Sequence, residues 1–505
     1  MDKMTDIIVS KYNEVYAKVN CERYILKEMS EYFTFYVPGY KFTPAFRDRI
    51  WDGKIRLLNL STGLIYLGLL SYIEEFCDDR EYSLDYSNDL DVEDEFSVYH
   101  AQKFIETLNL HAFGKAIKPR DYQIDAFVHA MQRKRTLLLS PTASGKSLII
   151  YMLFRQLLDY QGLKGLIVVP TTQLVEQLFS DFVDYSSETD FNVNDNVHRI
   201  YQGKDKNTEK KLTISTWQSI YKMPKEYFDQ FDFVIGDEAH GFKAQSLTTI
   251  LTSATKTKYR IGLTGTLDGT KTHKLVLEGL FGPVKKVITT KELIDDGSVA
   301  DLDIKCLVLK HPDDVCEKMN KSSYKDEIKY LIECESRNKF IKNLAVSLKK
   351  NTLILYYMVD KHGKVLYNMI QNTENLGNRK VFFVHGGTET EDREEIRRIM
   401  EEEDDAIVVA SYGTFSTGIN IRNLHNVIFA FPYKARIKIL QSIGRGLRKG
   451  EEKVKAVLYD IADDIRYKKY MNHTLKHFVE RVKTYTDEKF NFKIYKIGLK
   501  HGRTD

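Results

Sequence analysis

The chain of 505 residues is 43% hydrophobic and 29% charged, a balance typical of a globular protein in water with more than one domain. Its formal net charge of +4 is too small to indicate nucleic-acid binding, which would need a local basic surface. The five cysteines include no Cys-x-x-Cys pair, which argues against a zinc ribbon or a disulfide framework and favours a reducing cytosol. No apolar run reaches membrane-spanning length and the N-terminus lacks a signal-peptide pattern, so we expect a cytoplasmic protein without a membrane partner.

The first part of the chain, residues 1–85, is predicted to be a small separate α/β accessory module. Two short apolar runs near its start predict strands, and apolar residues at helical spacing predict a helix over residues 25–35. Asp52-Gly53 between two β-prone runs predicts a β-hairpin over residues 46–58.

This predicted hairpin carries cations around an aromatic residue. Arg47 and Arg49 precede Trp51, and Lys54 and Arg56 follow it. Cations interleaved with an aromatic side chain are typical of a nucleic-acid contact, so Arg47, Arg49 and Trp51 are candidate DNA-binding residues. A solvated hairpin whose Trp51 packs inward explains the same pattern equally well.

The remaining chain is predicted to hold two larger domains. Residues 86–112 comprise an acidic linker and a short helix. Beyond them, β-type apolar runs alternate with helical stretches, which predicts two tandem parallel-sheet α/β domains over residues 113–285 and 286–465. An amphipathic stretch then predicts a C-terminal helix that packs on the second domain, followed by a basic tail, within residues 466–505.

The stretch over residues 136–147 has the layout of a phosphate-binding loop. A short apolar run ends in a turn of small residues, and Gly145-Lys146-Ser147 opens a helix. The turn amides and the helix N-terminus would supply positive partial charge to a polyphosphate. Lys146 would reach the outer phosphates and the Ser147 hydroxyl would bind Mg²⁺. Because Ser140 replaces the first glycine of the strict pattern, this motif alone is also compatible with an ordinary strand–turn–helix.

Two acidic residues follow another apolar run, at residues 233–236. The run ends in Asp237-Glu238-Ala239-His240. A carboxylate at a strand tip beside a phosphate loop can hold Mg²⁺, and its neighbour can orient and deprotonate the attacking water. Two surface acids on a loop are the alternative, which the upstream phosphate loop makes the weaker one.

The second domain supplies a third motif. Gln441, Arg445 and Arg448 are spaced so that they share one face of a helix. Two guanidinium groups aimed at one place suit the charge that develops during phosphoryl transfer. Because they come from the other domain, hydrolysis would be coupled to the spacing of the two domains. Ordinary surface arginines are the alternative.

As a set, these motifs resemble the core of superfamily 2 helicases, which consists of two RecA-like domains. Further stretches match that family in order over about residues 119–460, among them Arg120-Asp121-Tyr122-Gln123, which resembles its adenine-reading motif. The N-terminal module and the stretch from Tyr485 to Asn491 are similar, more narrowly, to a phage helicase of recombination and fork repair.

The resemblance implies the following site residues. Catalysis would use Lys146, Asp237, Glu238, Gln441, Arg445 and Arg448, with Ser147 and Asp237 holding the metal. ATP would contact Arg120, Gln123, Thr142, Ala143, Ser144, Gly145, Lys146, Ser147, Gly418 and Asn420. Hydrolysis would be coupled to movement by His240, Thr264 and Thr266. DNA would contact Thr171, Thr172, Thr216, His385, Gly386 and Thr417.

The family also implies an activity. We expect a monomeric, ATP- and Mg²⁺-dependent DNA helicase with 3′-to-5′ polarity that remodels forks, four-way junctions and RNA–DNA hybrids, with recombination or single-strand-binding proteins as partners. Thr264-Gly265-Thr266 departs from the commoner Ser-Ala-Thr, and Asn420 stands where many relatives have Asp. These departures leave the details of coupling and of the ribose contact open.

Three other functions are compatible with these residues. They are an RNA helicase with the same core, a motor that translocates on duplex DNA without separating its strands, and an ATP-switched clamp or annealing factor. The complete catalytic set argues against an inactive binding module.

Overall fold

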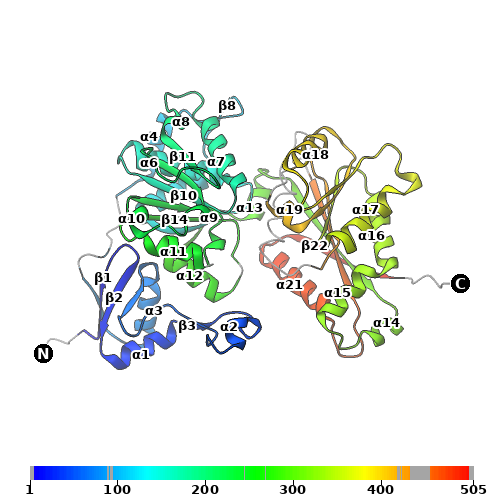
Figure 1. The fold of residues 1–505 in the computed structure, drawn as a ribbon, viewed down its shortest axis with the longest axis horizontal. Coiled ribbons are helices and arrows are strands. Elements are labelled where there is room, and N and C mark those ends of the chain that lie inside the picture. The colour runs from blue at the N-terminus through cyan, green and yellow to red at the C-terminus, as the bar shows by residue number, and fades with distance from the viewer. Residues whose placement is uncertain are drawn as a thin grey trace. The chain divides into compact units, whose positions relative to one another are not determined.

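The computed structural model describes residues 5–87, 90, 95–243, 245–267, 269–417, 421, 423–432 and 455–499. Contacts divide the chain into two compact units: residues 1–140 and 145–288 form the first, and residues 289–505 are assigned to the second together with residues 141–144. The first unit is coloured blue to green in Figure 1, and the second continues to red. None of the helices within the described ranges combines the length and hydropathy that crossing a bilayer requires.

The first unit begins with a small α/β module built on a four-stranded sheet in the order β5-β2-β1-β6. Successive residues of its strands face the core and the solvent in turn, since Ile7 and Val9 are buried whereas Ile8 is exposed. In chain order its elements are β1 (Ile7–Lys11), β2 (Tyr16–Cys21), α1 (Arg23–Tyr32), β3 (Thr34–Tyr36), η1 (Tyr40–Phe42), α2 (Pro44–Arg47), β4 (Lys54–Arg56), β5 (Leu64–Tyr66), η2 (Leu67–Leu69), α3 (Leu70–Arg80) and β6 (Leu84–Tyr86).

The β-hairpin predicted over residues 46–58 is wrong. β4 pairs antiparallel with β3, and the two strands are joined by residues 37–53, which include η1 and α2. Thr43 caps α2 by accepting a hydrogen bond from the Phe46 amide, and Pro44 occupies the first turn of the helix. This helix-starting pair overrides the β propensity of the residues that follow. We call residues 37–53 the β3–β4 excursion.

A seven-stranded parallel sheet, in the order β11-β12-β10-β13-β14-β9-β15, forms the rest of the first unit. Helices cover both faces, so successive strand residues belong to different cores: Leu166 and Val168 to one, Ile167 and Val169 to the other. Its strands are β9 (Arg135–Leu139), β10 (Gly165–Val169), β11 (Val197–Ile200), β12 (Leu212–Thr216), β13 (Phe233–Gly236), β14 (Tyr259–Thr264) and β15 (Val284–Lys286).

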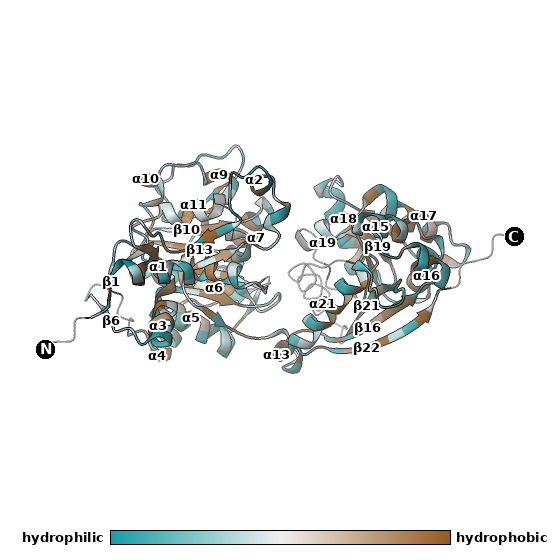
Figure 2. Cartoon of the chain, turned by 90° about the horizontal axis from the view of Figure 1, so that it is seen from below, coloured by the Kyte–Doolittle hydropathy of each residue, from teal (hydrophilic) through white to brown (hydrophobic). Residues whose placement is uncertain are grey.

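The helices of this domain and a short hairpin before it complete the first unit. They are α4 (Val98–Thr107), β7 (His111–Ala112), β8 (Lys115–Ala116), α5 (Asp121–Arg133), α6 (Lys146–Asp159), α7 (Thr172–Tyr185), α8 (Val193–Asn196), α9 (Trp217–Ile220), α10 (Lys225–Phe228), η3 (Ala239–Lys243), α11 (Gln245–Ser253) and α12 (Lys271–Phe281). Figure 2 shows hydrophobic strands such as β10 and β13 inside the domain.

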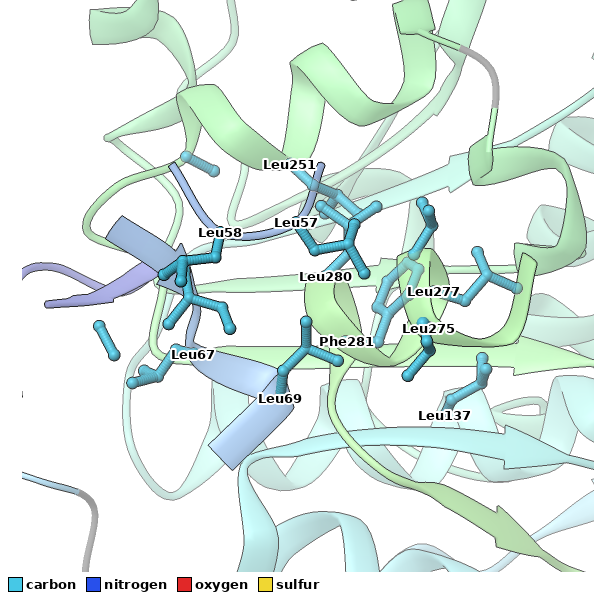
Figure 3. Packing of buried hydrophobic residues seen from close by; sticks show 14 of the residues in the cluster. Leu57, Leu58, Leu67, Leu69, Leu137, Leu251, Leu275, Leu277, Leu280 and Phe281 are labelled. Carbon is cyan, nitrogen blue, oxygen red and sulfur yellow. The ribbon is translucent and has the colours of Figure 1, made fainter. Parts of the chain in front are cut away.

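The N-terminal module is not separate from this domain. Leu57, Leu58, Leu67 and Leu69 of the module belong to the same buried cluster as residues of α12 (Figure 3). The module and the first parallel sheet therefore form one unit.

The second unit holds another seven-stranded parallel sheet, in the order β18-β19-β17-β20-β21-β16-β22. The predicted fold class, two RecA-like parallel-sheet domains, is thus confirmed. The strands of this unit are β16 (Asp301–Lys310), β17 (Thr352–Tyr356), β18 (Val381–Val384), β19 (Ile407–Ser411), β20 (Asn426–Phe429), β21 (Lys455–Asp464) and β22 (Asn491–Gly498). The helices are α13 (Thr290–Asp295), α14 (Asp313–Lys318), α15 (Tyr324–Glu333), α16 (Glu335–Ser347), η4 (Val359–Gly363), α17 (Lys364–Gln371), η5 (Glu374–Leu376), α18 (Thr390–Glu402), α19 (Tyr412–Thr417) and α21 (His473–Asp487).

The C-terminal part of the second unit differs in one respect from the prediction. The amphipathic helix α21 packs on β21 as expected, and its Arg481 pairs with Asp460 in the interior. The stretch beyond it, predicted to be a basic tail, instead contributes the edge strand β22, which pairs in parallel with β16. Lys493 and Lys496 of this edge strand are exposed, and their charge made the segment resemble a basic tail in the sequence.

Candidate ATP and DNA sites

The predicted phosphate-binding loop connects β9 to α6. Left-handed backbone at Ala143 (φ 69°) and Gly145 (φ 77°) forms its turn. The Ser140 amide donates to the carbonyl of Thr264 at 2.8 Å, which ties the start of the loop to the end of β14. Lys146 folds back over the loop, with its Nζ donating to the Ser140 carbonyl at 3.3 Å. Ser140 therefore fits at the first glycine position of the strict motif.

The predicted adenine-reading residues lie beside this loop. Gln123 is 5% exposed, and its Oε1 accepts a hydrogen bond from the Arg120 amide at 2.9 Å. Its Nε2 lies 3.4 Å from the Gly145 carbonyl, and a Cβ atom added to Gly145 would come within 2.3 Å of that nitrogen. Arg120 donates to the Tyr122 hydroxyl at 3.1 Å. The glycine thus lets the glutamine approach the end of the phosphate loop.

The two predicted catalytic carboxylates follow β13. Asp237 is 6% exposed, and its Oδ1 accepts a hydrogen bond from the Glu238 amide at 2.9 Å. Burial, reinforced by the charge of Glu238 and opposed by that of Lys146, raises the pKa of Asp237 to about 6. Glu238 Oε1 lies 4.0 Å from Lys146 Nζ, so the acids and the lysine share one place at the end of the sheet.

This donor set fits Mg²⁺. The Asp237 carboxylate and the Ser147 hydroxyl are hard oxygen ligands of the kind that this ion prefers. A cation beside Asp237 would also stabilise the charged form, which burial and Glu238 disfavour. Among the residues that the structure describes, His, Cys, Asp and Glu side chains form no group of three or more able to hold a metal alone.

The three predicted coupling residues are in contact. His240 Nδ1 lies 3.1 Å from Thr264 Oγ1 and 3.3 Å from Glu238 Oε2. Thr264 Oγ1 donates to the Thr266 carbonyl at 3.0 Å, so it accepts from the imidazole N–H of His240. The catalytic acids are thereby connected to the segment that follows β14.

The predicted DNA contacts of the first unit lie at the carboxyl ends of two neighbouring strands. Thr171 follows β10 and caps α7, accepting a hydrogen bond from the Leu174 amide at 3.3 Å, and Thr172 is the first residue of that helix. Thr216 ends β12, and its hydroxyl lies 2.9 Å from the Ser219 hydroxyl. Since β10 and β13 are adjacent parallel strands, these threonines share the edge of the sheet that carries the catalytic acids.

The predicted contacts of the second unit follow β18 and β19. His385 donates its amide to Thr388 Oγ1 at 3.0 Å and accepts on Nδ1 from the Gly387 amide at 3.0 Å. Arg393 donates to the Gly386 carbonyl at 2.8 Å, which fixes this turn. Thr417 ends α19. Five predicted residues lie outside the part of the chain that the structure describes: Gly418, Asn420, Gln441, Arg445 and Arg448.

The predicted DNA contacts of the module lie in the β3–β4 excursion. Arg47 and Arg49 are exposed, whereas Trp51 is half-buried and its indole N–H donates to the Lys54 carbonyl at 2.9 Å. Sequence reasoning missed further aromatic and apolar groups here. Phe42 is 77% exposed and Ile50 is 80% exposed. The sequence shows that both residues stand near Arg47 and Arg49, but their exposure is visible only in the structure.

Two more residues near the predicted site were missed. Tyr185, at the end of α7, lies with its hydroxyl 2.8 Å from that of Ser147, and burial raises its pKa to about 12, so it stays protonated. Gln218 donates to the Pro170 carbonyl at 3.2 Å and joins the segments that carry Thr171 and Thr216. Tyr185 gives no sequence signal, because only the packing of α6 on α7 brings it to the phosphate loop.

Comparison with known families defines the class. Residues 116–269 match the family model "Type III restriction enzyme, res subunit", and residues 335–450 match "Helicase conserved C-terminal domain". Together with the two parallel sheets, these matches identify a superfamily 2 helicase, an enzyme that hydrolyses ATP in dependence on nucleic acid. Residues 6–87, the N-terminal module, match "DNA helicase UvsW, N-terminal".

Comparison with individual relatives identifies the family within this class. The chain is 35% identical to the ATP-dependent DNA helicase UvsW of Enterobacteria phage T4 over 512 aligned residues, covering 98% of this chain and 100% of the relative. The crystal structure of T4 UvsW superposes with a TM-score of 0.52 at 33% identity, over 98% of this chain and 100% of that one. The chain is also 23% identical to the DNA 3′-5′ translocase XPB2 of Sulfurisphaera tokodaii, covering 71% of this chain and 85% of that protein. The chain belongs to the UvsW family of ATP-dependent DNA helicases.

Proposed function

We propose that the chain moves 3′ to 5′ along DNA and thereby unwinds and remodels forks, four-way junctions and RNA–DNA hybrids. The observation that carries this proposal is the shared edge of the first parallel sheet. The phosphate loop, Asp237, Glu238, Thr171 and Thr216 all lie there, so ATP and a DNA strand would meet the same strand ends. The direction is supported by the likeness to a protein named as a 3′-5′ translocase.

In the proposed reaction, each residue at this edge has one task. Lys146 binds the outer phosphates of ATP, and Ser147 and Asp237 hold Mg²⁺. When bound, the ion supplies positive charge that neutralises the phosphate oxygens. Glu238 orients a water molecule and accepts its proton as the water attacks the γ-phosphate. Gln123 and Arg120 hold the base.

The second unit would complete the reaction. Arg445 and Arg448 stabilise the charge on the transferred phosphoryl group, with Gln441 on the same helix face. Gly418 and Asn420 contact the nucleotide from the same unit. Because ATP would need groups from both units, its binding and hydrolysis would alternately draw them together and release them.

The strand itself would be held mainly by its phosphates. The contacts proposed for this are made by Thr171, Thr172, Thr216, His385, Gly386 and Thr417. Hydroxyl and backbone groups at phosphates position a strand without reading its bases, so affinity should follow DNA structure rather than sequence. Arg47, Arg49 and Trp51 of the β3–β4 excursion would add a contact at the branch point, where unpaired bases are available for stacking.

A panel of substrates tests this function. ATP hydrolysis and strand separation are measured on single-stranded DNA, forks, four-way junctions, RNA–DNA hybrids and RNA, with the single-stranded tail placed at either the 3′ or the 5′ end. We expect stimulation by DNA and unwinding only of substrates with a 3′ tail. Stimulation by RNA alone would indicate an RNA helicase, and turnover without strand separation would indicate a duplex translocase or a clamp.

A further inference from the structure

We call residues 237–240, which follow β13 and include the two proposed catalytic acids, the catalytic loop. The helix α12 contacts this loop through a buried side chain. His273 is 4% exposed, and its Nε2 lies 3.0 Å from the backbone carbonyl oxygen of His240. A carbonyl oxygen only accepts hydrogen bonds, so the imidazole donates its Nε2–H. Two hydrogen bonds therefore fix His240. Its backbone carbonyl accepts one from His273 of α12, and its side chain makes the other with Thr264. The start of α12 is fixed in turn, because Thr270 caps it by accepting from the His273 amide at 3.3 Å.

The other end of α12 contacts the N-terminal module through a buried carboxylate. Glu278 is 3% exposed and accepts a hydrogen bond from the Tyr72 hydroxyl at 2.6 Å. Its Oε1 also accepts from the Val284 amide at 3.0 Å, so the carboxylate joins the module to β15. The backbones are close as well, since a Cβ atom added to Gly68 of η2 would lie 2.0 Å from the Glu278 carbonyl oxygen.

Between these two ends, α12 lies in an apolar interface with the module. Leu277 and Leu280 of the helix share a cluster with Leu57 and Leu69 of the module (Figure 3). At the first turn, Lys271 Nζ lies 5.5 Å from the ring centre of Phe35, a residue of β3. That strand leads directly into the β3–β4 excursion, which carries the proposed DNA contacts.

We propose that His273 is a positioning residue through which the N-terminal module sets the conformation of the catalytic loop. The inference rests on the proposed function, because it assumes that the module contacts DNA and that Glu238 and His240 act in ATP hydrolysis. α12 has 11 residues and contacts the module near one end and the His240 carbonyl near the other, so a displacement of the module would be passed along a single rigid element. DNA bound at the module would then act on hydrolysis along one helix of the same unit.

The first test removes the hydrogen bond to the catalytic loop. His273→Phe keeps a ring but loses the N–H donor, and His273→Gln restores a donor. His198→Phe is the matched control, because His198 Nε2 also bonds a backbone carbonyl, that of Asp205 at 2.8 Å, on the edge strand β11. We expect His273→Phe to lower DNA-stimulated kcat about fivefold, with the KM for ATP and the Kd for forked DNA nearly unchanged. His273→Gln and the control should resemble the wild type.

The second test acts at the module end of the helix. Tyr72→Phe removes only the hydroxyl that bonds Glu278, and Tyr86→Phe is its control, since that hydroxyl bonds Glu74 at 2.9 Å within the module. We expect Tyr72→Phe to lower stimulation by forked DNA about threefold without changing turnover in the absence of DNA. The double variant with His273→Phe should lose no more than His273→Phe alone, because both changes interrupt the same connection.

Three results would overturn the inference. They are unchanged stimulation in His273→Phe, multiplicative losses in the double variant, and a loss in His273→Phe that His273→Gln does not restore and that follows a lowered midpoint of thermal unfolding. A wild-type chain without DNA-stimulated turnover would instead contradict the proposed function. A wild-type chain with such turnover, and no effect of His273→Phe, would contradict only the role of His273.

Discussion

The two parallel sheets share an architecture, but the pKa of a buried carboxylate is raised in one and lowered in the other. In the first sheet, burial and the neighbouring Glu238 raise the pKa of Asp237 to about 6. In the second, burial would raise the pKa of Asp463, but Arg337 and His311 outweigh it and hold that pKa at about 2. Asp463 accepts from Arg337 Nε at 2.9 Å and from His311 Nε2 at 3.0 Å. Among the described residues, no arginine compensates the charge of the first carboxylate, which is the proposed ligand of Mg²⁺, whereas the second is paired with cationic groups in the interior.

The same difference extends to the loops. β9 and β13 of the first sheet lead into the phosphate loop and the acidic pair. In the second sheet, β21 carries Asp460, whose carboxylate is bonded by Arg481 and the Tyr485 hydroxyl, so it anchors α21. The buried carboxylates of the two sheets thus differ in their electrostatics more clearly than the sheets differ in topology.

Removing the positive charge of the Lys146 side chain should have the largest effect on ATP hydrolysis. Lys146→Ala should lower ATP turnover by about 100-fold or more, because a preorganised charge at the phosphates contributes several kcal/mol in the transition state. Steady-state ATPase assays with forked DNA measure this, with Lys164→Ala as the control, since Lys164 bonds Gln230 on the surface of the same unit. Turnover like that of the wild type would remove the distinction between the two sheets.

Neutralising Asp463 should lower the stability of the protein, whereas neutralising Asp237 should lower its ATPase activity. Asp463→Asn leaves Arg337 buried with its main partner neutral, so we expect the free energy of unfolding to fall by about 3 kcal/mol. Asp237→Asn should abolish hydrolysis yet leave stability equal or higher, because it removes a desolvated charge next to Glu238. Thermal and urea unfolding of both variants, with ATPase assays, measure this. Equal destabilisation by the two changes would contradict the comparison.

The two carboxylates should also affect stability over different pH ranges. The pKa of Asp463 is lowered by folding, so its stabilising contribution is present above about pH 4 and is lost as the pH falls toward 2. The pKa of Asp237 is raised by folding, so its charge costs stability as the pH rises from about 4 to 6. Unfolding of the wild type and both Asn variants between about pH 3 and 7 should show the two differences changing in these separate windows. A single shared window would contradict the assignment.

The smallest effect is expected at the N-terminal module. Replacing Arg47 and Arg49 by Ala should weaken binding to forked DNA several-fold. The magnitude of the slope of the logarithm of affinity against the logarithm of salt concentration should fall by the amount expected for the loss of about two phosphate contacts. Replacing the exposed Arg23 and Lys27 of α1 removes equal charge from the same module and serves as the control. Binding titrations at several salt concentrations measure this, and equal loss in both double variants would indicate a general charge effect.

Local sequence signals predicted the first sheet and the strand–turn–helix at residues 135–159 correctly, because both depend on short apolar runs and on small residues next to them. The excursion was predicted wrongly because the Thr43-Pro44 helix start acts against the hairpin signal of Asp52-Gly53. Contacts between distant segments could not be predicted. The bond between Ser147 and Tyr185 joins residues 38 positions apart, and only the packing of α6 on α7 brings them together.

The core that the N-terminal module shares with the first sheet has a consequence for exchanging this module between related proteins. A module transplanted alone would arrive without the partner surface that α12 provides, including Glu278 and the leucines of its inner face. Natural recombination and deliberate chimeras alike should therefore succeed only when residues 1–87 are inherited together with residues 271–281. For the same reason, truncation at the acidic linker would expose the part of α12 around Glu278 and Gly279 that the module covers, so that a loss of solubility could be mistaken for a loss of DNA binding.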